Sequence, residues 1–234
     1  MICDTIDCVG CGVCESVCPK QCIEMKENDE GFLYPQVDEE KCIGCGLCTK
    51  KCPQNINIKP SKSEFYMAWH KDKEVLQKSS SGGVFSALAN YFLERNGVVV
   101  GAYYDSVSKD VRHIAITSAD ELDKLRLSKY YQSRTDEIFK DVRRYIDDGR
   151  LILFSGTACQ IAALKAYLGD KSSSSLLYTV DVLCHGVANK KTVMAYIHDK
   201  EKQYKKKIID FAFRVKADRE GWQSGGDENE IGIR

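Results

Sequence analysis

Two stretches decide the N-terminal fold: "CVGCGVCESVCP" from Cys8 to Pro19 and "CIGCGLCTKKCP" from Cys42 to Pro53. Each places four cysteines at spacings of two, two and three residues, and each closes on Cys-Pro. The glycines between the cysteines lack a Cβ, so the backbone loop can approach a bulky group closely. The repeat therefore predicts two equivalent halves that bind the same kind of group.

The run C-x2-C-x2-C-x3-C-P binds 4Fe–4S clusters, and in two-cluster ferredoxins its fourth cysteine ligates the other cluster. We therefore expect crossed ligation, in which each half gives three ligands to one cluster and one ligand to the other. A segment of about sixty residues has little core of its own, so the metal would also stabilise its fold. The expected ligands are Cys8, Cys11, Cys14 and Cys52 for the first cluster, and Cys42, Cys45, Cys48 and Cys18 for the second.

Zinc is the alternative to iron–sulfur clusters. Zinc ribbons use paired C-x2-C knuckles that give four ligands to each ion. Two complete runs that each end in Cys-Pro fit that pattern poorly, so clusters are favoured. Cys3 and Cys22 stay outside both ligand sets, and we interpret them as small buried side chains.

Composition limits the partners of the chain. In its 234 residues, 34 basic side chains balance 34 acidic ones, so no net charge attracts it to nucleic acid or anionic lipid. The start "MICDTIDCVG" lacks the basic and apolar regions of a signal peptide, and no apolar run is long enough for a membrane span. We expect a cytoplasmic protein without nucleic-acid partner or membrane span, whose reduced thiols favour metal over disulfides.

The predicted fold class is α+β: a small two-cluster ferredoxin-like domain followed by an α/β flavin-binding domain that is incomplete at its C-terminus. A hairpin is expected between the two cysteine runs, with its turn at 28–31. Beyond them, strand-like and helix-like segments alternate, which is typical of an α/β domain. The expected strands are 98–104, 111–117, 151–154, 176–184 and 208–213, and the expected helices are 79–97, 135–149, 158–169 and 189–204.

We predict domain boundaries from these patterns: a cluster domain at 1–60, a linker at 61–78, an α/β domain at 79–222 and a polar tail at 223–234. The helix at 79–97 is expected to begin with serine caps. Its buried face is expected to carry Val84, Phe85, Leu88 and Phe92.

Two junctions in the α/β part have the composition of phosphate sites. "SSSGG" (79–83) lies at a helix start, and "FSGTACQ" (154–160) joins a strand end to a helix start. Helix N-termini offer N–H groups to phosphates, and ligands in such sheets lie at the carboxyl ends of strands. Neither stretch is a complete Walker or dinucleotide motif, so plain helix caps are the alternative.

Five stretches occur in order behind the cysteine runs: "SSSGGVFSALANYFLERNGVVVGA", "SKYYQS", "LFSGTACQIAALKAYL", "YTVDVLCHGV" and "FAFRVKADREGW". Together they resemble the coenzyme F420 hydrogenase/dehydrogenase beta subunit family, up to about Trp222. The resemblance implies a flavoprotein that binds FAD and passes electrons between a two-electron partner and iron–sulfur clusters. Some relatives act on the deazaflavin coenzyme F420, and others, in pigment metabolism, take electrons from ferredoxin.

The resemblance also implies a flavin site. In it, amides at helix N-termini and the Lys129 ammonium group would neutralise the pyrophosphate. Two departures accompany the resemblance: Ala158 stands where proline is usual, and the chain ends soon after Trp222, so we expect a truncated or frameshifted product. The implied flavin-site residues are Ser80, Ser81, Gly82, Gly83, Ser128, Lys129, Tyr130, Gly156 and Thr157.

No catalytic residue is identified, although Cys159, Cys184 and His185 lie in matching motifs. The two cysteines are either buried structural thiols or neighbours of the flavin, and a further cluster on them stays open. His185 is either a donor to reduced flavin or a core histidine. The remaining histidines stand apart from the motifs, and we interpret them as structural or exposed: His70, His113 and His198.

The sequence thus predicts an oxidoreductase with two 4Fe–4S clusters and FAD. Its expected partners are a small-molecule electron donor or acceptor and a redox protein, either a ferredoxin or another oxidoreductase subunit. Two alternatives stay open: an electron-carrier or docking protein that binds clusters but no flavin, and a zinc-stapled interaction module. The sequence does not identify the substrate.

Overall fold

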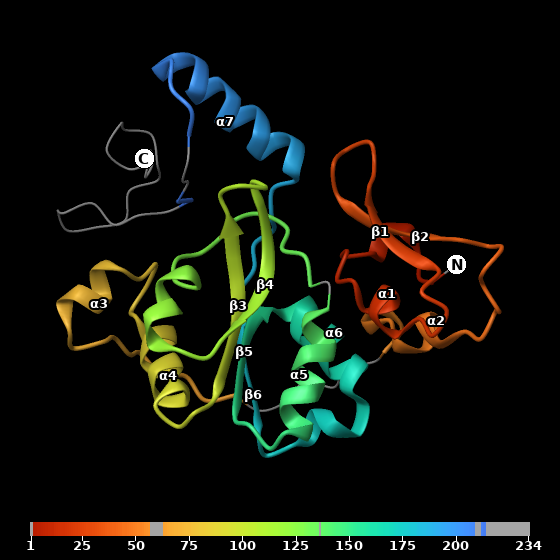
Figure 1. The fold of residues 1–234 in the computed structure, drawn as a ribbon, viewed down its shortest axis with the longest axis horizontal. Helices are drawn as coiled ribbons and strands as arrows, with labels where there is room; N and C mark the ends of the chain where they lie inside the picture. Colours follow the sequence, from red (N-terminus) through yellow and green to blue (C-terminus); the bar gives the residue numbers. More distant parts are fainter. Residues whose placement is uncertain (1, 57–62, 136, 209–211, 214–234) are drawn as a thin grey trace.

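The computed structural model describes residues 2–56, 63–135, 137–208 and 212–213. In Figure 1 a small N-terminal unit, red to orange, lies beside a larger unit built around a sheet of β3, β4, β5 and β6. The chain is therefore a mixture of α and β structure, as the sequence predicts.

The N-terminal unit contains the expected hairpin. Strand β1 (Ile23–Glu27) pairs antiparallel with β2 (Leu33–Val37). The Asn28 carboxamide accepts the backbone N–H groups of Glu30 and Phe32 and so closes the turn.

Two short helices follow the cysteine loops of this unit. Helix α1 (Val13–Val17) begins after Gly12, and α2 (Leu47–Lys51) begins after Gly46. Both glycines are left-handed, with φ of 75° and 69°, a conformation that favours glycine because it has no Cβ. Each helix ends just before the cysteine that precedes proline. Two 3-10 turns complete the unit, η1 (Thr5–Asp7) and η2 (Pro53–Asn55).

The larger unit contains a mixed sheet with the strand order β4-β3-β5-β6 among the described residues. Strand β3 pairs antiparallel with β4 and parallel with β5, which is in turn parallel to β6. All four strands were predicted. Their bounds are Val98–Asp105 for β3, Asp110–Ile116 for β4, Ile152–Thr157 for β5 and Leu177–Val182 for β6.

Helices cover both faces of this sheet, as Figure 1 shows. Because side chains alternate along a strand, Val99 packs with α4 (Val84–Leu93) on one face. Val98 and Val100 pack on the other face, against α5 (Ile138–Asp147) and α6 (Ala158–Leu168). Two 3-10 turns, η3 (Ala119–Lys124) and η4 (Gly169–Ser173), lie in the connections.

Helix α7 (Lys190–Tyr204) also was predicted, and its Val193 and Ile197 pack against Tyr104 and Val111 at the end of the β3–β4 pair. A short helix, α3 (Lys73–Gln77), lies within the predicted linker. The predicted strand at 208–213 falls largely on residues outside the described ones. Across the described ranges, no helix has the length and apolar character that spanning a membrane requires.

The start of α4 differs from the prediction. Its N-cap is Gly83, with φ of 76°, and no side chain caps the helix, so the expectation of serine caps is wrong. Val84 and Leu88 are 43% and 36% exposed, whereas Ala89 and Phe92 are buried. The buried face is therefore rotated from the predicted one, because the left-handed glycine sets the direction in which the helix leaves the loop.

Candidate iron–sulfur and flavin sites

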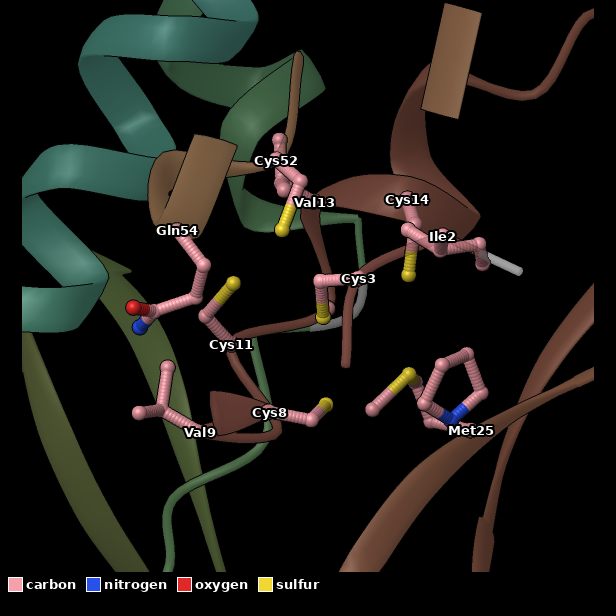
Figure 2. Close-up of a pocket in the computed structure, with 12 residues that line it drawn as sticks. Ile2, Cys3, Cys8, Val9, Cys11, Val13, Cys14, Met25, Cys52 and Gln54 are labelled. Atoms are coloured by element: carbon pink, nitrogen blue, oxygen red, sulfur yellow. The ribbon is translucent and has the colours of Figure 1, made fainter. Parts of the chain in front are cut away.

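The first cysteine group surrounds a hollow in the N-terminal unit. Figure 2 shows the sulfur atoms of the labelled cysteines directed toward a common space, which is partly open to solvent. Cys52 comes from the second run but lies with the cysteines of the first, as crossed ligation requires. The cysteines lining this hollow are Cys3, Cys8, Cys11, Cys14 and Cys52.

These thiols fit a metal cluster chemically. Burial raises the pKa of Cys11 and of Cys14 to about 12, so without metal both are protonated at neutral pH. Iron would replace those protons and compensate the charge of the thiolates that result. The four predicted ligands of the first cluster thus line one hollow together with Cys3, and their role as ligands stays a prediction.

The second cysteine group lies around the start of β1 and the loop before α2. The Sγ atoms of Cys18 and Cys22 are 3.3 Å apart, and the pKa of Cys22 is raised to about 11 by its hydrogen bond to Cys18 and, further, by its interaction with Cys42. Burial alone would raise the pKa of Cys18, but hydrogen bonds from the Cys22 backbone and thiol lower it. Of the two thiols, Cys18 has the lowered pKa and Cys22 the raised one. The role of Cys18 as a ligand of the second cluster stays a prediction.

The two surplus cysteines differ in burial. Cys22 is buried, as expected, whereas Cys3 is only half-buried and lines the first hollow. In the described part of the chain, no group of three His, Cys, Asp or Glu side chains is arranged to bind a single metal ion. A 4Fe–4S cluster does not need such a group, because each of its four ligands binds a different iron atom.

The first cysteine loop packs directly against the larger unit. Val13 is 1% exposed and belongs to the same apolar cluster as the α5–α6 face of the sheet. The Thr135 hydroxyl donates to the Cys11 carbonyl at 2.9 Å, and the Leu33 N–H donates to Gln132 Oε1 at 3.0 Å. One continuous core therefore joins the two units.

Cys159 lies on this side of the larger unit. It is in the first turn of α6, and its Sγ is 3.0 Å from Thr157 Oγ1. After burial, the charge interaction with Cys159 also helps to raise the pKa of Cys11. Cys184 instead lies in an exposed loop after β6, where its sulfur accepts the Gly186 N–H at 3.4 Å, so its interpretation as a buried structural thiol is wrong.

The structure brings together two of the predicted flavin segments. The Ser128 N–H donates to Ser80 Oγ at 2.7 Å. Beside them, the Lys129 ammonium donates to the carbonyls of Lys124 and Arg126 at 3.2 and 2.5 Å. Burial lowers the pKa of Lys129 to about 7. A lysine whose charge is disfavoured in this way fits an anionic group, such as a pyrophosphate, that would restore the charge.

Other predicted flavin residues have structural contacts. The Thr157 N–H donates to Gln160 Oε1 at 3.0 Å, within the first turn of α6. A Cβ on Gly82 would lie 2.5 Å from the Ala68 carbonyl oxygen, and the His70 N–H donates to Gly82 at 2.7 Å. At Thr157 the contact is a helix cap, as the alternative expects, whereas no side chain caps the helix that follows Gly83. Ser81 and Tyr130 lie in the same two segments, and Tyr130 is 42% exposed.

His113 is a buried residue of this region that the sequence motifs do not mark. Its Nε2 lies 3.1 Å from the Ser155 carbonyl and its Nδ1 lies 2.8 Å from Ser133 Oγ. Because a carbonyl only accepts, Nε2 carries the proton and Nδ1 accepts from Ser133. Burial first, and then the Lys129 charge, lower the pKa of His113 to about 4. The ring is therefore neutral and structural, which is one of the two interpretations that the sequence allows for it.

His185 is exposed, so its interpretation as a core histidine is wrong. It follows Cys184 in the loop after β6, near the carboxyl end of that strand. Its role as a donor to flavin stays a prediction.

Comparisons with known proteins match both units of the chain. The 4Fe-4S dicluster domain matches residues 7–56. The family models for the N-terminal and C-terminal parts of the coenzyme F420 hydrogenase/dehydrogenase beta subunit match residues 65–140 and 149–233, respectively. The latter match extends beyond Trp222, where the motifs seen in the sequence end. A search of curated proteins found no significant match.

Among solved structures, the chain is similar to a chain of the F420-reducing NiFe hydrogenase complex from Methanosarcina barkeri. The identity is 23% and the TM-score is 0.47, over 58% of this chain and 48% of that chain. The present chain thus spans about half of the matched one, at 48%. On the strength of the family descriptions, this chain belongs to the coenzyme F420 hydrogenase/dehydrogenase beta subunit family and carries an N-terminal 4Fe-4S dicluster domain.

Proposed function

We propose that this chain is an iron–sulfur flavoprotein oxidoreductase. It passes electrons between a two-electron substrate and a redox partner protein, through FAD and two 4Fe–4S clusters. Family membership supports this assignment, and the family description makes an F420-like deazaflavin the first substrate class to test. The partner is a ferredoxin or another oxidoreductase subunit.

One observation carries the proposal: the first cysteine loop is built into the core of the larger unit. Val13 contributes to that core, and the Cys11 carbonyl accepts a hydrogen bond from Thr135. A cluster on this loop would lie between the α/β domain and the second cluster site. Electron transfer between a flavin in the α/β domain and the clusters then needs no movement of one unit against the other.

The second cysteine loop suits the opposite end of the relay. Cys42 and Cys45 are exposed, and Ile43 between them is 61% exposed. We therefore propose the order flavin, first cluster, second cluster, partner protein. Of the two cysteine loops, the second is the one that a redox protein can approach directly.

When bound, FAD would supply the conversion between two-electron and one-electron chemistry that the clusters lack. The residues of the chain would bind and orient the cofactor. Lys129 would hold the anionic part of the cofactor beside Ser80 and Ser128. The neutral His113 ring fixes the Ser155 carbonyl at the end of β5. No side chain needs to act as a nucleophile.

Anaerobic purification tests the cofactor content. The proposal expects one FAD with about eight iron and eight sulfide ions per chain. Clusters without flavin would instead support the electron-carrier or docking alternative. A colourless protein that holds zinc would overturn both of these functions.

A double variant tests the order of the relay. Cys42→Ala/Cys45→Ala removes two ligands of the second cluster and leaves the first loop intact. Substrate-reduced flavin should still reduce the first cluster, seen by EPR, while reduction of an external ferredoxin is lost. Unchanged ferredoxin reduction, with the second cluster absent, would refute the order.

A further inference from the structure

The first cluster site contains one thiol more than a cluster uses. A 4Fe–4S cluster held entirely by cysteines takes four thiolates. Among the described residues, the hollow of Figure 2 is lined by the four predicted ligands and by Cys3. Cys3 lies five positions before the first run, in a stretch that belongs to no cluster motif.

The contacts of Cys3 place it beside the ligand that crosses from the second half. Its side chain lines the same hollow as those of Cys52 and Cys8, with which Figure 2 labels it. Cys52 is the one predicted ligand of this site that does not come from the first loop, so its replacement would leave that loop unchanged.

One side chain positions both members of this pair. Asn55 Nδ2 donates to the Ile2 carbonyl at 3.0 Å and to the Thr49 carbonyl at 2.9 Å. The first contact fixes the backbone just before Cys3, and the second fixes the helix that leads to Cys52. After Cys3, the Asp4 side chain caps the turn η1 and so holds the stretch before Cys8.

We propose that Cys3 is a reserve ligand of the first cluster, able to take the place of Cys52. The exchange breaks the bond from iron to Cys52 Sγ and forms a bond from the same iron to Cys3 Sγ. The proton of the Cys3 thiol passes to the released Cys52 sulfur, so neither the charge nor the iron oxidation state changes. The inference rests on the cluster part of the proposed function.

The test is the iron content and the EPR spectrum of anaerobically purified variants, with no activity assay. Cys52→Ala should keep about eight iron ions per chain, with a shifted rather than absent first-cluster signal. Cys52→Ala/Cys3→Ala should fall to about four. Cys3→Ala alone should keep both clusters, because Cys52 remains.

Cys52→Ala/Cys22→Ala is the matched control, since Cys22 lies at the second site. It should keep the first-cluster signal that Cys52→Ala shows. Cys52→Val, which fills the place of the thiol without supplying a ligand atom, repeats the series with less loss of packing.

The inference is overturned if Cys52→Ala and Cys52→Val lose the first cluster as completely as the double variant does. Failure of both to accumulate as folded protein, while Cys3→Ala accumulates, also counts against it, because a working reserve ligand would keep the cluster. Failure of the proposed function looks different: the wild-type chain itself would lack iron or FAD.

Discussion

The two cysteine runs have the same spacing but different surroundings. Val13 in the first run is 1% exposed and joins the core of the α/β unit, whereas Leu47, at the matching place in the second, is half-buried. Gly10 lies against Gln132, and Gly44 has no atom within 4 Å of where its Cβ would be. Ligand spacing therefore sets what each run binds, and neighbouring elements set which run lies inside.

The largest expected effect tests whether the runs are coupled by crossed ligation. Cys18→Ala changes a residue of the first run, but we expect the second cluster, on Cys42, Cys45 and Cys48, to be lost or altered. The first-cluster EPR signal should stay as in the wild type. A change confined to the cluster of the first run would show that each run holds its own cluster.

The glycine pair tests the difference in packing. Gly10 and Gly44 have similar φ values of 62° and 65°, so alanine costs each about 1 kcal/mol in backbone strain. Only at Gly10 would the new Cβ meet other atoms, with Gln132 Nε2 at 2.2 Å and the Leu33 carbonyl oxygen at 2.7 Å. We expect Gly10→Ala to destabilise the fold by a further 1–3 kcal/mol or so, about the range for overpacking.

Anaerobic thermal unfolding, followed by circular dichroism, measures this difference between Gly10→Ala and Gly44→Ala. Equal melting temperatures for the two variants would show that the first loop does not pack against the larger unit in solution.

A smaller effect is expected from truncating the apolar side chains. Val13→Ala removes two buried methyl groups from a core shared by both units, which should cost about 2 kcal/mol. Leu47→Ala should cost no more than about 1 kcal/mol, because that side chain is half-buried already. The comparison of melting temperatures is made with both clusters in place. A larger loss of stability for Leu47→Ala than for Val13→Ala would show that the second cysteine run, and not the first, is the one buried against the α/β unit.

The smallest expected effect concerns the predicted flavin site of the larger unit. Lys129 has a pKa lowered to about 7 by burial, so it is charged below that pH and neutral above it. Bound pyrophosphate favours the charged form, so FAD affinity should fall as pH rises through about 7. The fall should be about tenfold, the size of one lost charge-assisted hydrogen bond.

Fluorescence titration of flavin-depleted protein with FAD, at about pH 6 and pH 8, measures this change. Lys129→Met should bind weakly at both values and show little pH dependence. An unchanged pH dependence in this variant would assign it to another group.

The alternation of strands and helices was predictable because burial on both faces of a sheet leaves a strong pattern in sequence. All four described strands, α4, α5, α6 and α7 were expected near their observed positions. The start and the buried face of α4 were not predicted, since they follow from the left-handed Gly83 and from the packing of the helix on the sheet. The exposure of His185 likewise depends on the course of a loop, which local sequence does not fix.

The sequence by itself determined the cluster chemistry, because three ligands within seven residues constrain a loop regardless of its surroundings. Only the tertiary structure decided that Val13 and Cys11 face the α/β domain, that Cys159 lies near Cys11, and that Cys3 joins the first site. Those relations link residues far apart in the chain, and they arise from packing across the boundary between the two units. The same packing makes one of two nearly identical motifs an interior site and leaves the other at the surface.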